Sequence, residues 1–208
     1  MNQVNYQKEL ERVIAENQRR GRVPKLLLHV CCAPCSSYCL EYLSRYFDIT
    51  VYYYNPNISI AEEYAYRLSE EKRFIAQKEF PRPVRIAESE YNPADFFAAV
   101  KGLEREPEGG KRCAACFRLR LAATAQKAAA EGYDYFTTTL TISPLKNARL
   151  LNDIGAEAAK ACGATWLYSD FKKKEGYKRS IELSREYNLY RQNYCGCVFS
   201  KAEQQAKM

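Results

Sequence analysis

The amino-acid sequence predicts an α/β fold: a single doubly wound, mainly parallel sheet flanked by helices. Short apolar runs alternate with helix-forming segments along the chain, and this order is typical of parallel strands joined by helical crossovers. The first run, Lys25–Val30, is mostly apolar, as expected of a strand buried on both faces. The 208 residues suffice for one domain with its own core, and we expect residues 1–208 to form that domain.

The first half of the chain predicts a lead-in helix, three strands and the helices between them. Residues 1–22 form the lead-in segment, in which Leu10, Val13 and Ile14 follow a 3.6-residue stripe and Gly21 stops a helix predicted over 2–20. Strands are expected where β-branched, aromatic or other apolar residues gather, at 25–30, 49–54 and 84–87. Helices are expected at 36–46, 60–80 and from 92 or 93 to 101.

The second half predicts two more strands and ends in a cysteine-bearing tail. The segment 104–110 is a loop, and helices are expected at 113–130, 146–161 and 178–187. Strands are expected at 135–139 and 165–168. The C-terminal segment 189–208 carries the last two cysteines, in the sequence Cys195-Gly196-Cys197.

Composition and charge narrow the class of function. Hydrophobic residues make up 47% of the chain, which argues against a disordered protein. Lys and Arg number 32 against 25 Asp and Glu, so the net charge of +7 favours a polyanionic partner, with nucleic acid as the first candidate. No stretch approaches the ~18 apolar residues of a membrane span, and the N-terminus is polar. We therefore expect a cytoplasmic protein with no membrane partner.

The most unusual feature of the composition is its nine cysteines. An odd number in a cytoplasmic protein argues against a disulfide scaffold and leaves metal binding or thiol redox chemistry. His29 is the only histidine, so a metal site would consist mainly of thiolates, which select zinc or iron–sulfur clusters. We expect His29 to be a strand residue with a satisfied hydrogen bond, and Cys39 and Cys162 to belong to the core.

The other seven cysteines fall in three short clusters. The first, at 31–35, directly follows the first strand, where parallel sheets bind their ligands. Its first two cysteines, together with Cys113 and Cys116, supply four thiolates compatible with either a tetrahedral zinc site or a cubane cluster. Cys195 and Cys197 can close a small, strained disulfide ring or bind a metal, and Cys35 can join them in a second sulfur-rich set.

Four strings of the sequence invite comparison with known families. They are HVCCAPCS (29–36), RCxxCFRLRL (112–121), TTTLTISPLKN (137–147) and SDFKKKEGYKRSIELSREYNLYRQNYCGC (169–197). In this order, and across nearly the whole chain from about residue 25 to 200, the sequence resembles the QueH-type epoxyqueuosine reductases. The combination of four motifs is far more specific than any single pair of cysteines.

The resemblance implies a HUP-like domain, a subclass of Rossmann-like folds, that carries a [4Fe-4S] cluster and performs the last step of queuosine formation on tRNA. By position, Cys31, Cys32, Cys113 and Cys116 resemble the cluster ligands, and Cys195 and Cys197 resemble the redox-active pair. Members of the family can also hold a lone metal ion beside the cluster, where an aspartate can stand in place of Cys35. We therefore expect a possible second metal ion, iron or zinc, at Cys35, Cys195 and Cys197.

The implied reaction removes the epoxide oxygen of epoxyqueuosine and leaves a cyclopentene. It consumes two electrons and two protons and releases water, whereas a single cubane normally passes one electron at a time. Our hypothesis is that Cys195 and Cys197, as a dithiol or as ligands of an iron near Cys35, assist the leaving oxygen. The candidate proton donors are Asp170, Tyr177, Lys178 and Tyr194, and the electron donor is not identified by the sequence.

A tRNA partner carrying epoxyqueuosine in its anticodon needs a cationic surface. The cations that flank the cysteine motifs are the candidates for phosphate contacts: Arg112, Arg118, Arg120, Lys172, Lys173, Lys174, Lys178 and Arg179. Tyr177, Tyr190 or Tyr194 could stack on an extruded base.

Two other functions share parts of this pattern. A nucleotide-dependent tRNA-modifying enzyme of HUP type would have a Gly- or Ser-rich phosphate loop after the first strand, where this chain has CCAPCSS. A zinc-stabilised tRNA-binding module without redox activity would explain the charge and the Cys113/Cys116 pair, but it gives no purpose to Cys195 and Cys197.

Overall fold

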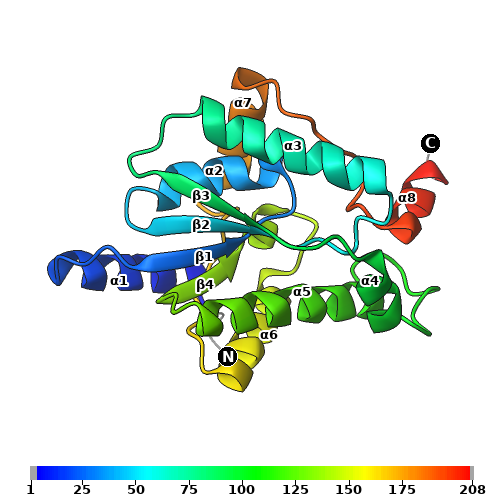
Figure 1. The fold of residues 1–208 in the computed structure, drawn as a ribbon, viewed down its shortest axis with the longest axis horizontal. Coiled ribbons are helices and arrows are strands. Elements are labelled where there is room, and N and C mark those ends of the chain that lie inside the picture. Colours follow the sequence, from blue (N-terminus) through cyan, green and yellow to red (C-terminus); the bar gives the residue numbers. More distant parts are fainter. Residues whose placement is uncertain (1–3, 207–208) are drawn as a thin grey trace.

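Four parallel strands, in the order β3-β2-β1-β4, form the sheet of the computed structural model, which describes residues 4–206 (Figure 1). Their bounds are β1 Lys25–His29, β2 Asp48–Tyr53, β3 Val84–Glu88 and β4 Tyr135–Thr138. The central strand β1 is paired on both sides, with Leu27 opposite Thr50 of β2 and Phe136 of β4. These are the first four strands that the sequence predicts.

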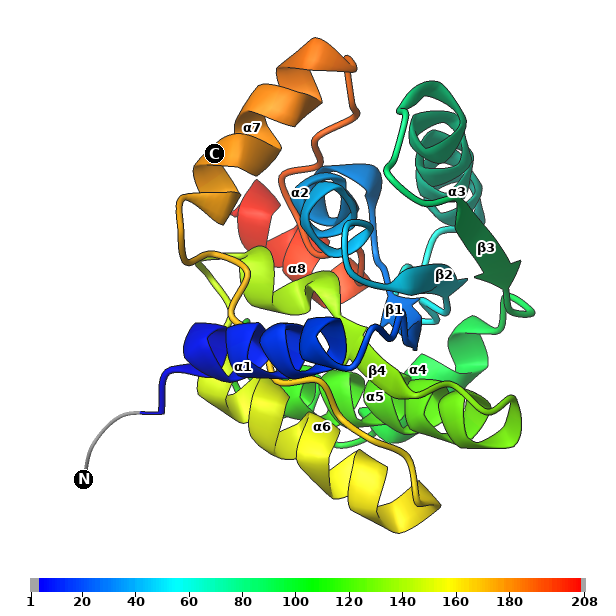
Figure 2. The same ribbon diagram turned by 90° about the vertical axis from the view of Figure 1, so that its left-hand side faces the viewer.

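Helices cover both faces of the sheet, as in a doubly wound fold. Their bounds are α1 Tyr6–Arg19, α2 Ala33–Leu43, α3 Ala61–Gln77, α4 Pro93–Ala99, α5 Lys111–Ala130, α6 Ala148–Cys162, α7 Gly176–Glu186 and α8 Val198–Gln205, with a short 3-10 helix η1 at Thr139–Ile142. Figure 2 shows α2 and α3 on one side of the sheet and α5 and α6 on the other. The side chains of β1 alternate accordingly: Leu26 and Leu28 pack with α1, α2 and α3, whereas Leu27 packs with α5 and α6.

The fifth predicted strand, 165–168, is not a strand, and this part of the prediction is wrong. Only an isolated bridge between Phe136 and Trp166 remains. The apolar run is buried for a different reason: Trp166 packs against Gly155, where a Cβ would lie 2.4 Å from the indole ring. At that bridge the segment keeps two backbone hydrogen bonds with β4, from the Phe136 N–H to the Thr165 carbonyl at 3.0 Å and from the Leu167 N–H to the Phe136 carbonyl at 2.9 Å. Asn152 Oδ1 accepts further hydrogen bonds from the Trp166 indole at 3.0 Å and from the Ser169 backbone at 3.1 Å.

Other bounds differ from the prediction by a few residues. Helix α2 begins at Ala33 with Pro34 in its first turn, so Cys35 is part of the helix rather than of the preceding loop. The tail contains α8, which the sequence pattern does not reveal. Residues 2 and 3 of the predicted first helix, and residues 207 and 208 of the C-terminal segment, lie outside the described part of the chain. No helix within 4–206 is long and apolar enough to cross a membrane.

The topology fixes where a ligand can bind. The chain leaves the edge strand β3 and returns to pair β4 with β1 on the other side, so the strand order reverses between β1 and β4. Ligands of open parallel sheets bind beyond the carboxyl ends of the strands at such a point. Cys31 and Cys32 follow β1 at this edge, and Thr139 follows β4.

Candidate active site

The first cysteine cluster occupies the turn from β1 into α2. Cys32 caps the N-terminus of α2, and the Sγ atoms of Cys31 and Cys32 lie 3.8 Å apart. With Cys35 they form a group whose sulfur atoms all lie within 4.8 Å of one another, the only such group of potential metal ligands among residues 4–206. This cluster can therefore hold a metal.

Cys31 is the cysteine of this cluster whose pKa is lowered. Hydrogen bonding with Cys32 and Cys35, assisted by the positive charges of Lys146 and Arg120, holds the pKa of Cys31 well below its usual range despite burial. The hydrogen bond with Cys31 in turn raises the pKa of Cys32 to about 12. A thiolate at Cys31 is the form that binds metals and acts as a nucleophile.

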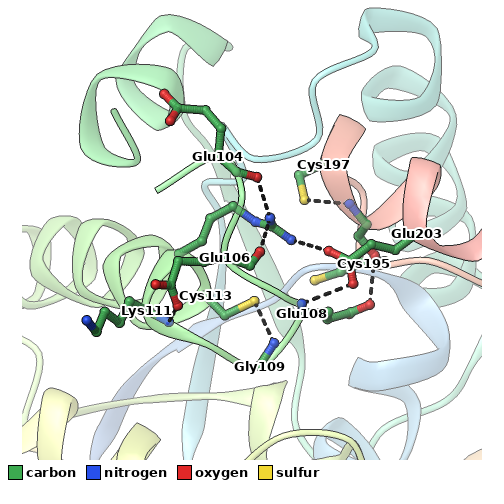
Figure 3. Close-up of polar contacts among 11 residues, drawn as sticks. Glu104, Glu106, Glu108, Gly109, Lys111, Cys113, Cys195, Cys197 and Glu203 are labelled. Carbon is green, nitrogen blue, oxygen red and sulfur yellow. Dashed lines mark hydrogen bonds and ion pairs between the residues drawn. The ribbon is translucent and has the colours of Figure 1, made fainter. Parts of the chain in front are cut away.

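The second cluster occupies the first turns of α5. The backbone N–H of Gly109 donates to Cys113 Sγ at 3.2 Å (Figure 3), whereas Cys116 is buried. Burial raises the pKa of both thiols, that of Cys116 to about 12. The N-terminus of a helix favours the thiolate form of a cysteine. A metal cation bound at this position would therefore find two thiols that lose their protons when it binds.

The third cluster begins α8. Cys197 caps this helix, and its Sγ accepts a hydrogen bond from the Ser200 backbone at 3.4 Å. The Ser200 hydroxyl accepts from the Cys195 backbone at 3.1 Å and donates to Glu108 at 3.1 Å. Each cysteine cluster thus lies at the N-terminus of a different helix.

A buried arginine of α3 holds the third cluster in place. Arg67 is 1% exposed, and its Nε donates to Glu63 at 2.6 Å. Its two terminal nitrogens donate to the carbonyls of Cys195 and Tyr194 at 3.3 and 3.4 Å, and the guanidinium stacks on the Tyr194 ring. Gly196 passes so close that a Cβ would lie 3.3 Å from Arg67 Nη1.

Two adjoining cavities connect the clusters. One, of about 290 Å³, is lined by Cys31, Cys35 and Cys195, and the other, of about 100 Å³, by Cys195, Cys197 and the two cysteines of α5. Cys195 lines both, as do Glu108, Leu145 and Lys146. The structure therefore brings the three clusters, which are far apart in the sequence, around one site.

Arg120 has no exposed surface, and two nitrogen atoms of its guanidinium lack hydrogen-bond acceptors among residues 4–206. Its Nη1 donates to Asn55 Oδ1 at 3.4 Å, but Nε and Nη2 have no hydrogen-bond acceptor within the described chain. Burial alone would lower the pKa of Arg120, but the electrostatic effect of the neighbouring cysteines, Cys116 first, raises it instead. Unpartnered buried donors of this kind call for an anion beside them.

The remaining cysteines and the histidine are structural, as the sequence predicts. Both ring nitrogens of His29 have partners, Thr138 Oγ1 at 2.9 Å and the Tyr54 carbonyl at 3.2 Å. Burial lowers the pKa of His29 to about 3, so the ring stays neutral. Cys39 is fully buried in the core, and Cys162 is half-buried against the other core layer.

Asp170 lies apart from the cysteines. It lines a third cavity, of about 810 Å³, to which no cysteine contributes, and its Oδ1 accepts from Lys172 Nζ at 2.7 Å. Lys178 is exposed and lines none of the three cavities. Among the predicted proton donors, only Tyr177 and Tyr194 line the cavity that holds Cys31, Cys35 and Cys195.

Two of the predicted phosphate-binding cations are buried. Arg112 is 2% exposed, because its guanidinium bonds to the Glu104 carbonyl at 2.9 Å and to Glu203 at 2.6 Å (Figure 3). Arg120 has no exposed surface at all. Neither guanidinium is therefore accessible to tRNA phosphates, although the positions of both arginines beside the cysteine motifs predict such contacts.

The other predicted cations lie on the outside. Four of them are exposed: Arg118, Lys173, Lys174 and Lys178. Four of them have carboxylate partners: Lys172 with Asp170, Lys174 with Glu11, Lys178 with Glu175 and Arg179 with Glu41. Tyr177 is 37% exposed at the mouth of the 290 Å³ cavity.

Three residues of the site are missing from the sequence-based prediction. Lys146 lines all three cavities, Arg67 anchors Cys195, and Glu71 is fully buried with a hydrogen bond from Ser36 at 2.8 Å. Lys146 is part of the TTTLTISPLKN string and could have been selected there. Arg67 and Glu71 lie in an ordinary charged helix sequence, which gives no signal that they are buried.

Comparison with known proteins agrees with this arrangement. A sequence model of the family "Epoxyqueuosine reductase QueH" matches residues 26–203. Proteins of that name are similar to this chain in Staphylococcus epidermidis (46% identity over 97% of this chain and 86% of the relative) and in Streptococcus pyogenes serotype M1 (45% identity over 95% and 78%). A third, from Thermotoga maritima, is 37% identical over 88% of this chain and 93% of its own length. The chain therefore belongs to the QueH family of epoxyqueuosine reductases.

Proposed function

We propose that this protein removes the epoxide oxygen of epoxyqueuosine in the anticodon of tRNA and so forms queuosine. Membership of the family supports the reaction. The observation that carries the proposal to this chain is the convergence of three cysteine clusters on two cavities that share Cys195. The larger cavity, of about 290 Å³, is bordered by Tyr177 and Tyr194, as a pocket for a ring-bearing substituent would be.

The donor set fits a sulfur-ligated redox group. Cys31, Cys32, Cys113 and Cys116 would hold a [4Fe-4S] cluster, and the unpartnered donors of Arg120 favour an anionic group among these cysteines. Cys35, Cys195 and Cys197 would hold a possible second metal ion, iron or zinc. When bound, the cluster supplies electrons one at a time.

The chain's own residues have two tasks in this reaction. Both C–O bonds of the epoxide break, a C–C double bond forms, and the oxygen leaves as water after taking up two electrons and two protons. As a dithiol, Cys195 and Cys197 would supply both electrons by forming a disulfide, and the two protons that their thiols release would reach the oxygen through a donor beside it. An external electron donor would then reduce the disulfide. Tyr177 and Tyr194 are the proposed proton donors, since both line the cavity with Cys195.

The proposed tRNA surface consists of the exposed cations that flank Tyr177 in the sequence, and Tyr177 itself lines the 290 Å³ cavity. Lys173 and Lys178 flank the start of α7, and Tyr177 between them is exposed enough to stack on a base. Lys172, Lys174 and Arg179 would add charge once their internal ion pairs exchange for phosphate contacts.

The test is an anaerobic preparation assayed on tRNA that carries epoxyqueuosine, with the loss of one oxygen from the nucleoside as the readout. Iron, zinc and acid-labile sulfide are measured on the same sample, with the visible spectrum before and after dithionite. We expect brown protein that bleaches on reduction, and loss of turnover in Cys195→Ser and Cys197→Ser but not in Cys162→Ser. Colourless protein with one zinc, still free of iron after reconstitution, would contradict the proposal and favour a zinc-stabilised tRNA-binding module.

A further inference from the structure

Lys146 lies where all three cavities meet. It belongs to the turn between η1 and α6, directly before Asn147, which caps α6. The cysteines that line the first two cavities come from all three clusters, and the third cavity opens toward the exposed Lys173. The side chain is half-buried, so its ammonium group can reach both the sulfur atoms and a molecule that enters from outside.

The Lys146 ammonium has no partner within residues 4–206, neither a hydrogen bond nor an ion pair. The other cations near the site differ in this respect, because Arg67 pairs with Glu63 and Arg112 pairs with Glu203. A lysine carries its charge at neutral pH, and the side chain of Lys146 is half-buried. A partly desolvated charge without a partner is costly unless an anion binds beside it.

The turn holds Lys146 in a fixed position. Its backbone N–H donates to the Ser143 carbonyl at 3.2 Å, and the Leu145 N–H donates to Ser143 Oγ at 3.3 Å. Asn147 Oδ1 accepts from the Leu150 backbone at 3.2 Å, which anchors the next residue to α6. These bonds fix the backbone from which the Lys146 side chain extends, so the side chain stays directed to the cavities that it lines.

We propose that Lys146 is a catalytic residue whose ammonium donates a hydrogen bond to the epoxide oxygen and stabilises the negative charge that forms there when the C–O bond breaks. The inference rests on the proposed function. Lys146 keeps its proton in this role: the two electrons come from the redox-active cysteines or the metal group that they hold, and the two protons come from other donors. Arg120 cannot take this role, because it has no exposed surface with which to touch a substrate.

The test compares Lys146→Met, which keeps the length of the side chain and removes its charge, with the wild type and with Lys160→Met. Lys160 is the matched control, since it is an exposed lysine of α6 that lines none of the three cavities. We expect kcat on epoxyqueuosine tRNA to fall about 10²- to 10³-fold in Lys146→Met, with KM within about threefold of wild type and with the iron content and visible spectrum unchanged. Lys160→Met should keep its kcat.

Chemical rescue separates a catalytic from a structural role. In Lys146→Ala, added ethylamine should restore part of kcat, because a small ammonium ion can occupy the space that the side chain leaves, whereas equal ionic strength from sodium chloride should not. An unchanged kcat in Lys146→Met overturns the proposal, and two other results also overturn it. If KM rises while kcat is unchanged, Lys146 contacts a tRNA phosphate instead. If the variant loses iron, the metal group is the anion whose charge Lys146 balances. A wild-type enzyme without turnover would instead refute the proposed function, so it is measured first.

Discussion

Gly196, between the two cysteines of the third cluster, gives a quantitative prediction. Its φ of +120° lies outside the range that residues with a Cβ adopt, and a Cβ would lie 2.9 Å from Ile58 Cγ1 and 3.3 Å from Arg67 Nη1. Neither neighbour has room to move, because Ile58 is fully buried and Arg67 is tied to Glu63. The backbone strain costs about 1–3 kcal/mol, and forcing a methyl group into a packed space costs about 1–3 kcal/mol more.

The control variant for Gly196→Ala is Gly132→Ala. Gly132 also has a positive φ, +67°, but nothing lies within 4 Å of its Cβ position, so only a backbone cost of about 1–2 kcal/mol applies. The segment around Gly196 can escape its strain by detaching, which would expose Cys197. Detachment relieves both costs, about 2–6 kcal/mol together, and therefore speeds alkylation of the buried Cys197 by about 30- to 10⁴-fold.

The assay is alkylation of protein purified without oxygen, at matched iron content, followed by mass spectrometry of the peptides that contain Cys195 and Cys197. Gly196→Ala should label much faster than wild type, and Gly132→Ala should label at the wild-type rate. Equal labelling rates in all three proteins would refute the packing of Gly196 against Arg67 and Ile58.

Three further predictions follow from the contacts described. Arg67→Met should lower Tm by about 2–10 °C, since about 1–3 kcal/mol is lost with a buried charge partner, and a melting curve like that of wild type would refute the anchor. Burial raises the pKa of Glu71 to about 8, so the folded state keeps a proton that the unfolded chain releases above about pH 4.5, and the stability of the wild type falls as pH rises from there to about 8. Glu71→Gln does not have this loss, so its Tm relative to wild type should rise between pH 5 and 8. A difference in Tm that stays constant over this range would contradict the prediction. Replacing Lys173 and Lys178 with Gln should reduce the dependence of log Kd for tRNA on log salt by about 0.7–0.9 for each lost phosphate contact, and an unchanged slope would remove both residues from the tRNA surface.

The sequence predicts the four strands of the sheet well, because each is a short apolar run next to a clear turn or helix signal. It also places the first cysteine cluster at the carboxyl end of β1, since this follows from the parallel topology alone. The run at 165–168 has the same apolar pattern, but local sequence cannot show that its pairing with β4 stops at a single bridge. A segment that packs against a helix and a segment that forms a sheet strand both contain a short run of apolar residues, so this pattern does not distinguish them.

The charged residues of the site are harder to predict, because their roles depend on what surrounds them. Arg67 and Arg120 look like surface residues in the sequence, yet both are buried beside the cysteines. Asp170 lies within a motif that resembles the family, but the fold turns it toward a cavity without sulfur atoms. Cys31 and Lys146 are 115 positions apart in the sequence, so only the folded chain shows that they line the same cavity.

The arrangement of the three clusters determines when the site can form. A fragment that stops before residue 195 would contain all four strands and the helices that cover both faces, and most of the hydrophobic contacts would already be present. It would still lack one wall of each cysteine-lined cavity. Cys31 and Cys195 line the same cavity, so bringing them together closes one of the longest loops available in this chain, and such steps come late in folding. The thiols at 31–35 therefore stay open to oxidants and stray metals during synthesis, until the segment from residue 195 onward arrives to enclose them.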